Sequence, residues 1–236
     1  MKKILVPCDF SDSAKQAYKF AVDIASANSG EIFVVKVIDL TPVFADSLDT
    51  SPYYLHITSI LKDLEETAWN DFEAMMKDID AKNVKVTFVV EQGTVCQTLL
   101  KQIHKHEADL VIMGTHGVNG IKEFLVGSNA EKIVQCAPVP VFVTHHAQDI
   151  TYIKNIIFPT QIDLNQTRLF EKIKVLQAFF NAKLHLLYIK TTEKSIPNEE
   201  LETSLRNLAV FYNLSDYTIN VRRYHNEEDG ISQFAR

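Results

Sequence analysis

The feature that most limits the fold of this 236-residue sequence is a regular alternation of short apolar segments with longer helical ones. Five apolar segments predict strands: 2–7, 31–39, 84–93, 109–114 and 140–145. Segments with apolar residues at helical spacing lie between them: 12–28, 57–81, 95–106 and a short one near 129–136. Strands that alternate with helices of this length predict an α/β fold with a parallel sheet and helices on both faces.

The pattern starts again near residue 153. The two clearest matches pair "KKILVPCDFS" (2–11) with "IKNIIFPTQID" (153–163), and "GEIFVVKVI" (30–38) with "AKLHLLYIK" (182–190). Pro7 is thereby matched by Pro159. Such self-similarity indicates an internal duplication. We expect one whole domain, residues 1–147, followed by a partial second copy, residues 151–236, that ends inside its third helix.

Composition excludes several classes of protein. The apolar fraction of 46% and the charged fraction of 23% are typical of a globular chain. No apolar run is long enough to span a membrane, and the N-terminus lacks the apolar core of a signal peptide. The three cysteines show no C-x-x-C spacing, which disfavours a disulfide framework and a zinc site. We therefore expect a reduced, cytoplasmic protein with no membrane partner.

The charge pattern gives no sign of a nucleic-acid partner. The formal net charge is −6, and the acidic excess lies within residues 1–150. No stretch of lysine and arginine forms the basic stripe that a phosphate backbone requires. We expect no nucleic-acid binding.

Four of the seven glycines lie from the end of the predicted fourth strand to the short helix that follows, and three of them fit a spaced motif. Gly114, Gly117 and Gly127 fit G-x-x-G-x(9)-G-[ST], with Ser128 in the last place. The spacing is neither that of a P-loop, because the chain has no Gly-Lys pair, nor that of the Rossmann fingerprint. Ligands of open α/β sheets bind beside such loops. The alternative is that these glycines serve only tight turns.

This loop, the opening "KKILVPCDFS" and the ending "APVPVFV" closely resemble the universal stress protein family. The resemblance covers residues 2–145, and an incomplete second copy resembles the family from about residue 153. It implies an open five-stranded parallel sheet in the order 3-2-1-4-5. It also implies ATP binding, with or without Mg²⁺, because one branch of the family binds ATP through the full glycine motif.

The resemblance also assigns roles to individual residues. On the phosphate side we expect Gly114, Gly117, Gly127, Ser128 and Asn129, with His116 either near a phosphate or merely exposed in the loop. On the nucleoside side we expect Pro7, Cys8, Asp9, Val37 and Met113. Lys122 is the only obvious cation in the loop, and it is expected to face solvent. In the second copy, Gln161 occupies the position that corresponds to Asp9, so residues 151–236 are expected not to bind nucleotide.

The function expected from the resemblance is ATP binding in a stress-response or regulatory module, without dedicated catalysis. Two alternatives stay open: a slow ATPase or ATP-using enzyme on the same fold, and an interaction protein that binds no nucleotide. The family's fifth strand lies at the sheet edge, so Val139, Val141, Phe142 and Val143 are expected to form a two-fold homodimer. The second copy folding back over this edge is the alternative.

Two pairs of residues outside the motif receive local explanations. The His145–His146 pair is expected to end a strand rather than bind metal, because neighbouring strand residues point to opposite faces. Cys96 and Cys136 are expected to be small packing residues.

Overall fold

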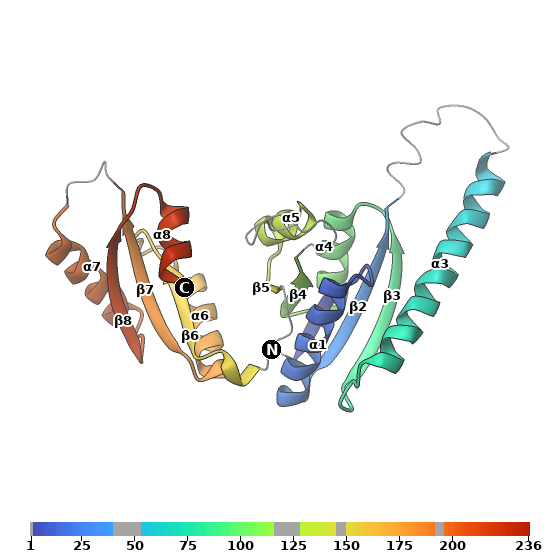
Figure 1. The fold of residues 1–236 in the computed structure, drawn as a ribbon, viewed down its shortest axis with the longest axis horizontal. Helices are drawn as coiled ribbons and strands as arrows, with labels where there is room; N and C mark the ends of the chain where they lie inside the picture. Colours follow the sequence, from blue (N-terminus) through green and yellow to red (C-terminus); the bar gives the residue numbers. More distant parts are fainter. Residues whose placement is uncertain (1, 40–52, 116–127, 145–149, 192–195) are drawn as a thin grey trace. The chain divides into compact units, whose positions relative to one another are not determined.

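The computed structural model describes residues 2–39, 53–115, 128–144, 150–191 and 196–236, and only the backbone of residues 53–57 and 128. The chain divides into two compact units, residues 1–149 and residues 150–236. They are called here the first unit and the second unit, and each is described by itself (Figure 1). None of the helices in these ranges is both long and apolar enough to cross a bilayer.

The first unit contains a five-stranded sheet in the order β3-β2-β1-β4-β5. Its strands are β1 (Lys3–Pro7), β2 (Glu31–Ile38), β3 (Lys85–Gln92), β4 (Leu110–Gly114) and β5 (Val141–Thr144). Every neighbouring pair is parallel. The expected strand order is confirmed, and each strand boundary lies within one residue of its predicted position.

In the described part of this unit, four helices cover the sheet: α1 (Asp12–Asn28), α3 (Tyr53–Asp78), α4 (Val95–His106) and α5 (Ser128–Cys136). Strand residues alternate between the two faces, so Leu5 and Val35 pack with Leu99 of α4 and Ile133 of α5 in one buried cluster. On the other face, α1 packs along β1 and β4. The expected helices on both faces are confirmed (Figure 1).

The edge strand β5 follows the same alternation. The ring of Phe142 packs against Phe20 of α1, with centroids 5.1 Å apart. Val141 and Val143 instead contact the cluster beneath α4 and α5. The long helix α3 borders the opposite edge, where Phe72 stacks on Phe88 of β3 with centroids 4.3 Å apart.

The second unit is a smaller β/α arrangement with a three-stranded parallel sheet in the order β6-β7-β8. Its elements are the 3-10 turn η1 (Ile150–Tyr152), β6 (Asn155–Pro159), α6 (Thr167–Phe180), β7 (Lys183–Lys190), α7 (Asn198–Phe211), β8 (Tyr217–Arg223) and α8 (Glu227–Phe234). Phe170 and Tyr212 stack at 4.0 Å within its buried core, beside Leu205 of α7. This is the partial second sheet and helix region that the sequence predicts.

Local backbone geometry repeats between the units with the same offset as the sequence. The amide of Cys8 donates to the carbonyl of Val35 at 2.9 Å, and the amide of Thr160 donates to that of Leu187 at 2.9 Å. The residues two positions later both adopt left-handed backbone, with φ of 64° at Phe10 and 62° at Ile162. A strained turn after the first strand is thus common to both units.

Candidate functional site

A cavity of about 140 Å³, called here the first cavity, opens at the carboxyl ends of β1, β2 and β4. The strand order explains its position. The connection after β1 leads to β2 on one side of β1, whereas β4 pairs with β1 on its other side. The connections between strands therefore run in opposite directions from this point of the sheet. A crevice outside the strand ends at such a switch point is the usual ligand site of open α/β sheets.

Seven of the eleven predicted site residues line the first cavity. They are Pro7, Cys8, Asp9, Val37, Met113, Gly114 and Asn129. Ser128 begins α5, but its side chain lies outside the described residues. His116, Gly117 and Gly127 lie wholly outside them.

Three helices begin at the first cavity. Ser13 and Ala14 belong to the first turn of α1, Val95 is the first residue of α4, and Asn129 and Ala130 belong to the first turn of α5; all five line the cavity. The free N–H groups and the dipole of a helix N-terminus favour negative charge. Three such ends around one hollow favour an anion, although α1 and α5 each carry one carboxylate in the first turn, Asp12 and Glu131, against three in α8.

Asp9 is held in place by Ser11. The backbone amide of Ser11 donates to Asp9 Oδ1 at 3.0 Å, and the Ser11 hydroxyl donates to the same atom at 2.6 Å. Ser11 is also the N-cap of α1, where its Oγ accepts from the amide of Ala14. Among the described residues only Ser11 donates to this carboxylate, so Oδ2 can accept a hydrogen bond from a ligand.

Lys36 also lines the first cavity, although neither the glycine motif nor the family resemblance predicts it there. Its Nζ lies 5.6 Å from the ring centroid of Phe10, within the range of a cation–π contact. The sequence does contain a sign of it, because Lys36 is the only cation within β2 and directly precedes Val37. Lys122, the cation in the loop, lies outside the described residues.

Cys8 contributes a neutral thiol to the wall. Its side chain is only 4% exposed, and burial raises its pKa to about 11. A thiol must ionise to act as a strong nucleophile. Cys8 is therefore suited to packing against a ligand rather than to attacking one.

The second unit has a hollow of its own, called here the second cavity, with a volume of about 280 Å³. Pro159, Thr160, Gln161, Leu187 and Ile189 line it and stand at the positions of Pro7, Cys8, Asp9, Val35 and Val37 under the sequence offset. The two cavities thus occupy equivalent positions within their units.

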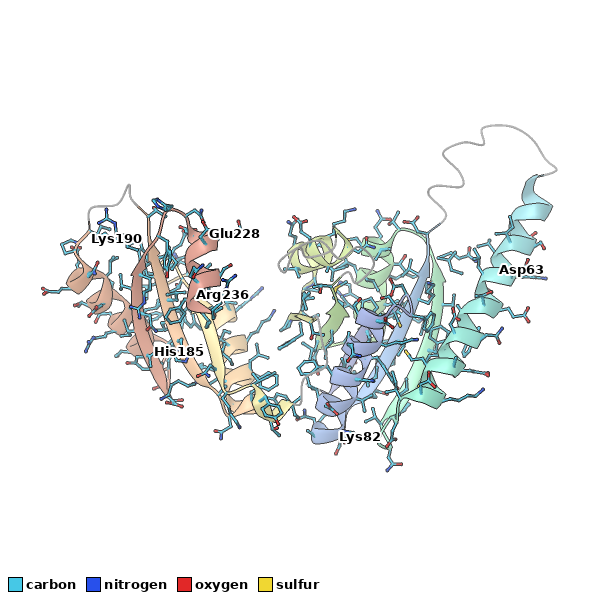
Figure 2. The ribbon with its side chains drawn as sticks, in the orientation of Figure 1. Asp63, Lys82, His185, Lys190, Glu228 and Arg236 are labelled. Carbon is cyan, nitrogen blue, oxygen red and sulfur yellow. The ribbon has the colours of Figure 1, made fainter. Side chains whose placement is uncertain are left out.

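The electrostatic character of the second cavity is different. Asp163 and Glu227 line it, and no lysine or arginine is among its described lining residues. The helix that begins there, α8, carries Glu227, Glu228 and Asp229 in its first turn. Figure 2 shows Glu228 at the beginning of α8 and Lys190 at the carboxyl end of β7. The carboxylates of Asp163 and of the first turn of α8 oppose a bound anion.

Metal ligands do not gather in the described part of the chain. There, no three His, Cys, Asp or Glu side chains lie close enough together to hold an ion. His145 and His146 lie outside the described residues. A divalent ion at the first cavity would need ligands from a bound phosphate group, as Mg²⁺ commonly does.

Comparison with known proteins identifies one family. Residues 1–145 match the universal stress protein family. A universal stress protein of Methanocaldococcus jannaschii is 30% identical over 142 residues, which cover 60% of this chain and 81% of that protein. A putative universal stress protein of Staphylococcus aureus is 31% identical over 143 residues, covering 60% of this chain and 82% of that protein.

Solved structures agree on the fold. The crystal structure of a universal stress protein from Archaeoglobus fulgidus covers 94% of this chain, and 78% of that chain is covered in turn. The TM-score is 0.66 at 16% sequence identity, a likeness that concerns the fold alone.

Proposed function

Because the chain belongs to the universal stress protein family, we propose that its first unit binds ATP in the first cavity and acts as a nucleotide-dependent stress-response or regulatory module. One observation carries the proposal. Residues that the glycine motif and the family resemblance assign to nucleotide binding, drawn from β1, β2, β4 and α5, line a single cavity at the switch point of the sheet.

The wall of the first cavity combines apolar residues with groups that attract anions, which suits a ligand that has an apolar ring and an anionic end. Pro7, Val37 and Met113 offer apolar surface suited to a purine ring. Asp9 Oδ2 can accept from a nucleoside N–H or O–H group. The first turn of α5 and the cation of Lys36 suit phosphates, with or without Mg²⁺.

We propose binding without dedicated catalysis at this site. Phosphoryl transfer requires a positioned nucleophile and groups that neutralise charge on the transferred phosphate. Cys8 is kept neutral by burial, so it is not a strong nucleophile. Timed product analysis with the purified chain tests this part: we expect bound ATP to be recovered intact, and turnover at the site would overturn it.

The second unit is proposed to be a degenerate partial repeat, so that residues 1–147 form the nucleotide-binding domain and residues 151–236 an architectural or regulatory one. Its carboxylates Asp163 and Glu227 disfavour a triphosphate, and Gln161 stands in place of Asp9. We further propose a two-fold homodimer through the β5 edge. Its contact residues would be Val139, Val141, Phe142 and Val143.

Matched substitutions in the two cavities provide the test. Val37→Phe places a larger side chain in the first cavity, and Ile189→Phe does the same at the equivalent position of the second. Titration calorimetry should show one ATP per wild-type chain. We expect Val37→Phe to weaken ATP binding by about tenfold or more, a change of about 1.4 kcal/mol per factor of ten.

The control should behave differently. Ile189→Phe should leave both affinity and stoichiometry unchanged, provided circular dichroism shows that each variant is folded. Equal effects of the two substitutions, or two equivalent sites per chain, would contradict the proposed location. Absence of any heat or bound nucleotide with folded wild-type chain would contradict nucleotide binding itself.

A further inference from the structure

Two cysteines far apart in sequence meet on the surface of the first unit. Cys96 is the second residue of α4 and Cys136 is the last residue of α5. Their Sγ atoms lie 2.9 Å apart, although 40 positions separate them in the chain. Cys136 is exposed and Cys96 is partly exposed, so a small oxidant can reach the pair. Cys96 packs against the buried cluster beneath α4 and α5, as the sequence predicts, whereas Cys136 is exposed and the prediction of a packing residue there is wrong.

We propose that Cys96 and Cys136 form a modification site, a dithiol that a hydroperoxide converts to an intramolecular disulfide. The two sulfurs need to approach by less than 1 Å to reach a bond length of about 2.05 Å. A short movement of side chains on two neighbouring helices supplies this approach, because α4 and α5 pack against each other. No third His, Cys, Asp or Glu joins the pair among the described residues, so a closed metal site is not formed there.

The helices assign different parts to the two sulfurs. A thiolate at Cys96 would lie in the first turn of α4, at the positive end of the helix dipole. A thiolate at Cys136 would lie at the negative end of α5. The hydrogen bond between the two side chains also raises the pKa of Cys136, with burial as a smaller cause. Cys96 is therefore the attacking sulfur, and Cys136 keeps its proton and resolves the intermediate.

The chemistry balances with the hydroperoxide as the two-electron oxidant. The Cys96 thiolate attacks one peroxide oxygen, the O–O bond breaks, and a sulfenic acid forms on Cys96. The departing alkoxide, or hydroxide from hydrogen peroxide, takes up the proton that the Cys96 thiol released and leaves as an alcohol or as water. Cys136 Sγ then attacks Cys96 Sγ. The S–O bond breaks as the S–S bond forms, and the leaving hydroxide takes the Cys136 proton to become water. Two thiols are oxidised and one peroxide is reduced.

Cys8 serves as an internal reference for this reaction. It is 4% exposed and lies in the wall of the first cavity, and burial raises its pKa to about 11. It should stay reduced under conditions that oxidise the surface pair. The disulfide would link the first turn of α4 to the last turn of α5, and the first turns of both helices line the first cavity.

The test uses the full chain and dilute hydrogen peroxide. We expect an intact mass lower by about 2 Da, as loss of two hydrogens requires, and a fall from three titratable thiols to one under denaturing conditions. Trypsin digestion without reductant should yield residues 86–101 linked to residues 133–154. Treatment with dithiothreitol should restore all three thiols.

Single substitutions separate the roles. Cys136→Ser should stop at a sulfenic acid on Cys96 that dimedone traps, whereas Cys96→Ser should leave Cys136 largely unmodified over the same time. Cys8→Ser should form the linked peptide as the wild-type chain does. The proposal is overturned if folded wild-type chain gains oxygen on separate cysteines, forms only disulfides between chains, or shows no linked peptide after the surface thiols have reacted.

Discussion

Gly114 at the end of β4 lies against the backbone of Ser13 in the first turn of α1. A Cβ atom at position 114 would lie 2.4 Å from the carbonyl oxygen of Ser13 and 2.5 Å from its carbonyl carbon. The contact brings the N-terminus of α1 to the first cavity, where Ser13 and Gly114 both form part of the wall. Close packing of α1 on β4 thus accounts for glycine at this position, without reference to a ligand.

Replacing Gly114 with alanine should therefore destabilise the first unit. The neighbouring atoms belong to backbone and cannot rotate away, so α1 or β4 must shift. We expect the free energy of unfolding to fall by about 1–3 kcal/mol, the range found for overpacked interiors. Urea denaturation followed by circular dichroism measures this. An unchanged midpoint would show that α1 and β4 separate at little cost.

Removing the charge of Lys36 should weaken ATP binding. Lys36→Met keeps most of the aliphatic stem but loses the cation that lines the first cavity. Hydrogen bonds to charged groups contribute about 1.5–3 kcal/mol, so we expect affinity to fall by about tenfold or more in calorimetry.

Lys85→Met is the matched control for this prediction. Lys85 pairs with Glu31 at 2.8 Å, at the amino ends of β3 and β2, whereas the first cavity lies at the carboxyl ends. An eight-residue strand spans about 25 Å, well beyond the screening length in physiological salt. Similar losses in both variants would mean that Lys36 acts only through net charge.

The buried thiol of Cys8 makes stability depend on alkaline pH. The folded chain holds this proton up to a pKa of about 11, whereas the ordinary value is 9.0. The unfolded thiol ionises first, so stability is fully present below about pH 9 and is lost as the pH rises towards 11. We expect this thiol to account for a loss of about 2–3 kcal/mol across that interval.

Cys8→Ala isolates this contribution. The variant should be less stable than the wild-type chain at neutral pH because it leaves a small void. Its urea midpoint should nevertheless fall less steeply between pH 9 and pH 10.5. Parallel curves for the two proteins would show that Cys8 ionises equally easily in the folded and unfolded chains.

The outer edge of β5 provides a test of the proposed homodimer. The amide of Val111 donates to the carbonyl of Pro140 on the inner side of β5. In a strand, the N–H and C=O of one residue point to the same side and alternate along the chain, so Phe142 faces β4 and Val143 faces the edge. Proline in place of Phe142 would disrupt the pairing of β5 with β4 and would not test the outer edge. Val143 is therefore the residue to substitute.

Val143→Pro removes an N–H from the outer edge, and Val143→Ala shortens the same side chain while keeping that N–H. If two chains pair through β5, light scattering should show a dimer for the wild-type chain and for Val143→Ala, with a shift to monomer for Val143→Pro. A monomeric wild-type chain, or a dimer that tolerates the proline, would place the contact elsewhere.

Residues close together in sequence predicted most of the secondary structure. Apolar periodicity gave α4 its observed bounds, Val95–His106, and placed all five strands of the first unit within one residue. The start of α3 was predicted at residue 57, but the helix begins at Tyr53, directly after Pro52. Proline is common in the first turn of a helix, so Pro52 is compatible with a start at this point.

The motif named part of the wall of the first cavity, and the residues that packing brings to that wall were missed. Asp9, Met113 and Asn129 were expected from the family pattern, and all three line the first cavity. Ser13 and Val95 were missed because they belong to helix N-termini whose meeting point depends on how the helices cross the sheet. Roles assigned to Gly117 and Gly127 stay predictions, because both lie outside the described residues.

The sequence by itself determined the β/α alternation, the parallel sheet, the family and the repetition of local geometry from Cys8 to Thr160. Each depends on patterns within a few residues or on direct self-similarity. Only the tertiary structure decided that Gly114 meets Ser13, that Cys96 meets Cys136, and that the two equivalent cavities differ in charge. The first two are contacts between elements far apart in the chain, and close packing on both faces of the sheet determines which residues meet. The charge of each cavity depends in the same way on which elements form its wall.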